Sequence, residues 1–133
     1  MNTVQEARSM FEKLKKIPVV EQLRIAPDSA IILMILGGRM ARGYLCSRSL
    51  VLSVFIDNTD NLLPETVKHI TLLLAACPET HDYALQLIPD SGWLSCYYDK
   101  NISAEKMATD IEKHLALTRY LANVIVGQKN SKM

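Results

Sequence analysis

The sequence predicts an α+β domain in which an antiparallel sheet packs against three helices. Apolar residues follow the helical period near each end of the chain and over residues 64–77. Between these segments lie short apolar runs rich in β-branched and aromatic residues, which are typical of strands. Turn sequences separate the runs, as expected for hairpins. The expected order is helix, three strands, helix, two strands and helix.

The first half of the chain accounts for the first helix and three strands. A capping box at Thr3-Val4-Gln5-Glu6 begins a helix that ends before Pro18, with Val4, Ala7, Phe11 and Leu14 on its apolar face. The uninterrupted apolar run Ala30–Leu36 predicts a strand that is buried on both faces. Gly37-Gly38 allows a tight hairpin that returns through Met40–Cys46. A third strand, Ser49–Asp57, carries one apolar face: Leu50, Leu52, Val54 and Ile56.

The second half predicts a helix, a hairpin and a final helix. Pro64 suits the first turn of a helix, and Pro78 prevents that helix from continuing beyond Cys77. The turn sequence Pro89-Asp90-Ser91-Gly92 then divides two strands between His81 and Tyr98. Ser103 can cap the last helix. We expect residues 1–127 to form a single domain and residues 128–133 to be a disordered tail.

Composition limits the kinds of function to consider. The chain has 133 residues, 49% of them hydrophobic and 22% charged, which is typical of a soluble globular domain. A formal net charge of +1 argues against nucleic acid or an anionic membrane as a partner. The three cysteines have no Cys-x-x-Cys spacing and indicate reduced thiols in a cytosolic protein. The longest apolar runs are too short to span a bilayer, so we expect no membrane insertion.

The sequence predicts neither an enzyme nor a metal or cofactor site. The histidines show no His-x-x-x-His spacing, and Pro78 interrupts the helix that would align Cys77 with His81. Gly37-Gly38-Arg39 lacks the spacing of a phosphate-binding loop. The carboxylates form no defensible acid–base pair. A Cys–His nucleophile pair could still form in the folded chain, although all three cysteines lie in apolar surroundings that favour inert thiols.

A set of short sequences resembles the SpiC family of type III secretion proteins. The resemblance spans most of the chain, is dense in the second half and is sparse before Ala41, so no roles are transferred to the first 40 residues. It rests on Ile17-Pro18, Ala41-Arg42-Gly43, Leu72-Leu73-Leu74-Ala75-Ala76, His81-Asp82-Tyr83-Ala84, Gln86-Leu87, Gly92-Trp93-Leu94, Tyr97-Tyr98, Ile111–Thr118 and Asn123-Val124-Ile125. The order of elements is also similar to that of class I type III secretion chaperones, which is a likeness of fold alone.

The resemblance implies a cytoplasmic regulator that binds a small chaperone-like subunit and the gatekeeper protein of the secretion system. Such a complex, at the cytoplasmic face of the export apparatus, lets translocator subunits leave first and holds effectors back. Two alternatives stay open. The protein could be a homodimeric chaperone for one effector, or a translocated effector that acts on host vesicle trafficking.

The expected partner interface combines the motifs with apolar stripes. Two stripes run along residues 63–77, more than a helix covered on one side needs, and a small domain that wraps its helices is the alternative explanation. Trp93 and Tyr97 share one strand face, where they could be core residues or interface anchors. If they are anchors, replacing Trp93 by alanine should weaken binding and leave the monomer folded. The predicted interface residues are Leu72, Leu73, His81, Asp82, Tyr83, Trp93 and Tyr97.

Two histidines are candidates for pH sensing. An imidazole changes charge across mildly acidic pH, and the SpiC resemblance implies a secretion switch between an acidic vacuole and neutral cytosol. His81 and His114 lie within the matching motifs. The alternative is that both are ordinary, partly buried histidines with satisfied hydrogen bonds.

Overall fold

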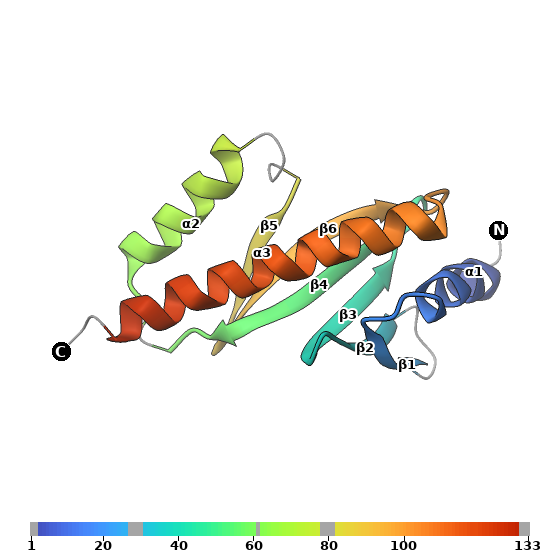
Figure 1. Cartoon of the computed structure of the whole chain (residues 1–133), viewed down its shortest axis with the longest axis horizontal. Coiled ribbons are helices and arrows are strands. Elements are labelled where there is room, and N and C mark those ends of the chain that lie inside the picture. Colours follow the sequence, from blue (N-terminus) through green and yellow to red (C-terminus); the bar gives the residue numbers. More distant parts are fainter. Residues whose placement is uncertain (1–2, 27–30, 61, 78–81, 131–133) are drawn as a thin grey trace.

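The computed structural model describes residues 3–26, 31–60, 62–77 and 82–130. Six strands form one antiparallel sheet in the order β1-β2-β3-β4-β6-β5 (Figure 1). The α+β class, the three helices and the antiparallel pairing are as predicted. The elements are α1 (Thr3–Lys15), β1 (Val20–Ile25), β2 (Ile31–Leu36), β3 (Arg39–Leu45), β4 (Ser49–Asn58), α2 (Pro64–Ala76), β5 (Ala84–Ile88), β6 (Ser91–Asp99) and α3 (Ala104–Asn130).

All three helices pack against the same face of the sheet. Helix α3 runs along the length of the sheet, with α1 near one of its ends and α2 near the other (Figure 1). Met10 and Leu14 of α1 share a buried cluster with Ile32 of β2. A second cluster joins Ile70 of α2 to Leu94 of β6. Both clusters include residues of α3, so this helix connects the two halves of the core.

Strand β1 is an element that the sequence did not predict. It pairs with β2, and its register shifts between Glu21 and Arg24, where Gln22 has a φ of 52°. This bulge places Val20 and Leu23 against the core although they are three residues apart. The alternation that identifies a strand is therefore absent from this segment of the sequence.

The prediction that the apolar run Ala30–Leu36 forms a strand buried on both faces is wrong. In β2, buried and half-buried residues alternate, with Ile32, Met34 and Leu36 facing the helices. The reason is that the helices cover one face of the sheet only. The apolar face predicted for the following strand is confirmed, since Leu50, Leu52, Val54 and Ile56 are all buried in β4. Ala30 lies outside the described residues.

The ends of the helices agree only in part with the expected caps and boundaries. Ser103 Oγ accepts the backbone N–H of Lys106 at 3.1 Å, as predicted for the start of α3. Helix α3 then continues through Gly127 to Asn130, into the segment predicted to be a disordered tail. Gln128 Oε1 accepts the backbone N–H of Leu63 at 3.0 Å, which connects the end of α3 to the start of α2. Residues 131–133 and the side chains of the predicted capping box lie outside the described part of the chain.

Replacement of Gly37 by alanine is expected to destabilise the fold more than the same change at Gly38. Both glycines have positive φ, 56° and 85°, in the hairpin between β2 and β3. A Cβ at Gly38 would meet nothing within 4 Å, whereas one at Gly37 would collide with the Leu115 side chain. Alanine at Gly38 should therefore cost about 1 kcal/mol through its backbone conformation alone. At Gly37 the collision should add roughly 1 kcal/mol more.

The measurement is urea denaturation of Gly37→Ala and Gly38→Ala beside the unmodified chain. Gly38→Ala is the matched control, because it shares the backbone penalty and lacks the collision. Equal losses of stability in the two variants would contradict the close approach of α3 to this turn.

Candidate partner-binding surfaces

The sheet face opposite the helices is broad and mostly apolar. No helix in the described part of the chain packs against it. Because successive strand residues point to opposite faces, the strand registers assign its residues. We call this surface the open face; its central residues are Leu33, Ile35, Met40, Arg42, Tyr44, Val51, Ser53, Phe55, Trp93, Ser95 and Tyr97. Met40 is 51% exposed and Tyr97 is 57% exposed.

Near the middle of the open face, Arg42 lies over the ring of Trp93. Arg42 Cζ is 4.6 Å from the centroid of that ring, which places the cation within cation–π range. Trp93 Nε1 donates a hydrogen bond to Ser91 Oγ at 2.9 Å. The Phe55 ring meets Trp93 edge to face, with centroids 5.4 Å apart. These contacts hold Trp93 in place and leave it only 3% exposed.

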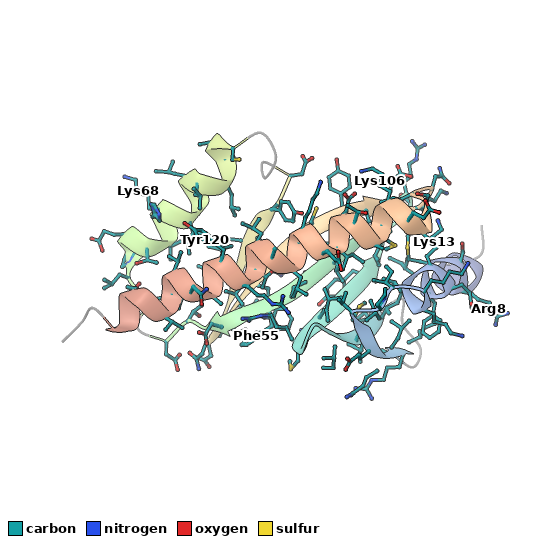
Figure 2. The ribbon with its side chains drawn as sticks, viewed as in Figure 1. Arg8, Lys13, Phe55, Lys68, Lys106 and Tyr120 are labelled. Atoms are coloured by element: carbon teal, nitrogen blue, oxygen red, sulfur yellow. The ribbon has the colours of Figure 1, made fainter. Side chains whose placement is uncertain are left out.

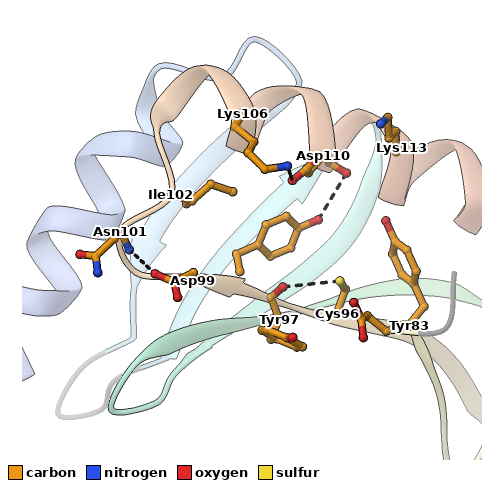
Figure 3. Close-up of a pocket in the computed structure, with 11 residues that line it drawn as sticks. Tyr83, Cys96, Tyr97, Asp99, Asn101, Ile102, Lys106, Asp110 and Lys113 are labelled. Atoms are coloured by element: carbon orange, nitrogen blue, oxygen red, sulfur yellow. Dashed lines mark hydrogen bonds and ion pairs between the residues drawn. The ribbon is translucent and has the colours of Figure 1, made fainter. Parts of the chain in front are cut away.

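On the helix side, a groove of about 750 Å³ lies between the first turns of α3 and the end of β6 (Figure 3). Beyond Ser95, β6 pairs with β4 alone, because Ala84 opposite Ser95 is the first residue of β5. The groove therefore runs beside a strand edge. Its wall includes an ion pair on α3, in which Lys106 Nζ lies 3.0 Å from Asp110 Oδ2.

His114 lies buried behind the groove with both ring nitrogens bonded. Its Nε2 lies 2.8 Å from the carbonyl oxygen of Leu94, which can only accept, so Nε2 carries the proton. The neutral ring then accepts a hydrogen bond at Nδ1 from the Tyr98 hydroxyl, at 2.9 Å. The Tyr83 ring meets the imidazole edge to face, with centroids 5.1 Å apart. Burial lowers the pKa of His114 from 6.5 to about 4.

The same burial affects the other ionisable groups around this ring. It raises the pKa of the Cys96 thiol to about 11, helped by the carboxylates of Asp82 and Asp110. It also raises the pKa of Tyr83 to about 12. Cys96 is therefore a protonated thiol at neutral pH, which is the unreactive form. His114 stays uncharged in the folded chain across mildly acidic pH.

The predicted interface residues fall into separate places. Trp93 and Tyr97 share the open face, as their spacing predicts. Asp82 and Tyr83 line the groove. The Tyr97 ring points away from the groove (Figure 3). Leu72 is 57% exposed on α2, whereas Leu73 is half-buried against the core. His81 lies outside the described residues.

Helix α3 also carries a second apolar stripe, formed by Leu117, Leu121 and Val124, which packs within the chain. Leu121 is fully buried in the cluster that includes Ile70 and Leu74 of α2, and Leu117 is partly buried against that cluster. For α3 the fold thus favours the explanation that a small domain wraps its own helices. On α2 the exposed Leu72 is not accounted for in this way.

Sequence reasoning missed most of the open face. Its β2 residues, Leu33 and Ile35, were predicted to lie in a fully buried strand. Arg42 was noted only as part of a matching motif. An arginine amid the apolar residues of adjacent strands was the available signal, but its meaning depends on which strands are neighbours.

Together these features define a class: a small one-sided α+β protein whose uncovered surfaces have the apolar character common at protein interfaces. No described helix is both long and apolar enough to cross a membrane.

The comparisons with known proteins then place the chain within this class. It is 42% identical over 122 residues to "Salmonella pathogenicity island 2 protein C" of Salmonella typhimurium strain LT2, covering 92% of each chain. It is 43% identical over 116 residues to a "SpiC homolog" of Salmonella typhi, covering 87% of this chain and 91% of the relative. No family model matches the sequence. The chain belongs to the SpiC family, which confirms the family suggested by the motifs.

Proposed function

We propose that this protein is a non-enzymatic regulator of type III secretion that binds a small chaperone-like subunit and the gatekeeper. The main support is the 42% identity, over 92% of the chain, to a protein named for a Salmonella pathogenicity island. The open face adds support, because large apolar surfaces usually mark protein contacts. By controlling when effectors follow translocators, such a complex would contribute to virulence.

The proposed mechanism is competitive occupancy of the export apparatus from its cytoplasmic face. The assembled complex holds the gatekeeper in place and excludes effectors until conditions weaken the assembly. The open face and the groove lie on opposite sides of β6, so one subunit could contact two proteins without competition between them. This arrangement is consistent with a subunit that bridges two partners.

The chemistry of the described residues favours binding over catalysis. The Cys96 thiol, with a pKa raised to about 11, is held in its unreactive form. The two nitrogens of His114 are occupied by Leu94 and Tyr98, which leaves neither free for proton transfer to a substrate. His114 is also a poor source of a charge switch at an interface, because its pKa of about 4 keeps it neutral while folded.

The test is affinity purification of the tagged full chain from its own bacterium, at mildly acidic and at neutral pH. We expect the gatekeeper and one small chaperone-like protein to copurify at acidic pH and to be lost at neutral pH. Recovery of one effector, or of a homodimer alone, would instead favour the secretion-chaperone alternative. Appearance of the chain in the medium under secreting conditions would favour the effector alternative.

A further inference from the structure

We propose that the open face binds a different protein, which presents an apolar surface with a carboxylate placed against Arg42. The inference deepens the proposed function, on which it rests for the existence of a partner. It adds the surface that holds this partner, and the chemistry that the partner must present.

The first step is the polarity of the open face. Val51 and Phe55 of β4 and Tyr97 of β6 continue the apolar surface that β2 begins with its open-face residues. A second sheet or an apolar helix face could remove this surface from water, which stabilises a complex by about 25 cal/mol per Å² of apolar surface. The face consists of paired strands, so a partner meets a surface that is already rigid.

The second step is the position of Arg42. Its strand neighbours are Leu33 and Ser53, which places it near the middle of the six strands. The Trp93 ring beneath it holds the guanidinium at the surface. Among the described residues, no carboxylate lies within ion-pair distance of Arg42.

The polar side chains near Arg42 do not compete with it for the partner's carboxylate. The Ser53 and Ser95 hydroxyls are 2.7 Å apart and bond to each other. Ser95 Oγ also donates to Gln86 Oε1 at 3.2 Å. The two hydroxyls are thus satisfied by hydrogen bonds that link β4, β6 and β5, whereas the Arg42 guanidinium retains N–H donors for a carboxylate. A covered arginine without such a partner would be costly, so charge complementarity defines the partner.

The third step excludes a second copy of this chain as the occupant. A two-fold axis through the middle of the open face would bring the two Arg42 side chains together, and like charges in a covered interface oppose binding. Glu21 and Asp99 are carboxylates at opposite ends of the sheet. Pairing Arg42 with Glu21 of a second copy would leave the Phe55–Tyr97 side uncovered. Pairing it with Asp99 would leave Ile35 and Met40 uncovered.

The test places a photo-crosslinking phenylalanine analogue at Tyr97 of the full chain in its own bacterium. Tyr120 is the matched control, because it is a tyrosine with 51% exposure on α3, away from the open face (Figure 2). We expect Tyr97 to give an adduct with one different protein and Tyr120 to give none with it. Absence of an adduct at Tyr97, an adduct with nucleic acid, or an adduct with a second copy would each overturn the proposal.

Charge reversal then tests the role of Arg42. Arg42→Glu should lower affinity for the captured protein by at least about 30-fold, as expected when one member of a covered charge pair is reversed. Arg48→Glu makes the same charge change at an exposed turn and should leave affinity unchanged. Changing the contacted carboxylate of the captured protein to lysine should restore binding to the Arg42→Glu variant. Equal effects of the two reversals, or no restoration, would contradict the assigned charge pair.

The identity of the captured protein separates the two proposals. A secretion-system subunit that depends on Arg42 supports both. An unrelated protein with the same dependence supports the open-face assignment and contradicts the proposed function. The crosslinking uses the native fold, so it decides the surface even if Arg42→Glu fails to fold.

Discussion

Lowering the pH from 7 to 4 is expected to remove about 3 kcal/mol of folding free energy through His114 alone. The unfolded chain protonates this residue near pH 6.5, whereas burial lowers its folded pKa to about 4. The contribution of His114 is therefore fully present above pH 6.5 and is lost as the pH falls from 6.5 to 4. A charged ring would also reverse the hydrogen bond to Tyr98, since Nδ1 would become a donor and the hydroxyl oxygen would have to accept.

Urea denaturation at several pH values, with His114→Gln as the comparison, measures this effect. Glutamine can donate to the Leu94 carbonyl and accept from Tyr98, and it does not titrate. We expect the variant to be less stable at pH 7 and to lose about 3 kcal/mol less on acidification. The carboxylates titrate in both proteins and cancel in the comparison. Parallel stability profiles would show that His114 is not protonated on unfolding.

The sign of this linkage bears on the proposed pH switch. Acid weakens the fold through His114, whereas the family resemblance implies a complex that holds in acid and is released at neutral pH. His114 cannot supply that release by changing charge while the chain is folded. The proposed switch therefore requires another titrating group in the chain or in a partner.

Replacing Trp93 by alanine is expected to cost about 3–5 kcal/mol of folding stability, the range for removal of a buried aromatic side chain. The change removes the edge-to-face contact with Phe55, the bond to Ser91 and the platform beneath Arg42. The near-complete burial of Trp93 thus favours the core interpretation, although the residue lies on the open face. Thermal and urea denaturation of Trp93→Ala measure the loss.

Tyr97→Ala is the control for this prediction. Tyr97 lies on the same strand face but is mostly exposed, so its replacement should change stability by less than about 0.5 kcal/mol. It is the better variant for a binding measurement, because the monomer should stay folded. A stable Trp93→Ala protein with weakened partner binding would instead support the anchor interpretation.

Most elements could be predicted because local signals marked their ends. Pro64 and Ser103 begin helices, and Gly37-Gly38 joins two strands, as the backbone preferences of these residues require. Strand β1 could not be predicted, because its bulge replaces the alternation with a spacing of three. The end of α3 was placed too early, since Gln128 bonds to Leu63, a residue 65 positions away.

The candidate surfaces were predicted less completely than the elements. Periodicity correctly put Trp93 and Tyr97 on one face, but it could not tell that Trp93 is covered by Arg42 and Phe55. The predicted interface, which combined motifs with stripes, also grouped Leu72 with Tyr83, which the fold separates onto α2 and the groove. Burial depends on neighbours from distant segments, and the strand order β3-β4-β6 supplies those neighbours.

By itself, the sequence determined the fold class, most helix and strand positions and the resemblance to the SpiC family, since these depend on local preferences and matched motifs. Only the tertiary structure decided that the described helices leave one sheet face uncovered, that Arg42 lies at its middle and that His114 is buried and neutral. The physical reason is that helices from both ends of the chain cover one face together. Which side chains remain for a partner, and which ionisable groups lose contact with water, follows from that packing.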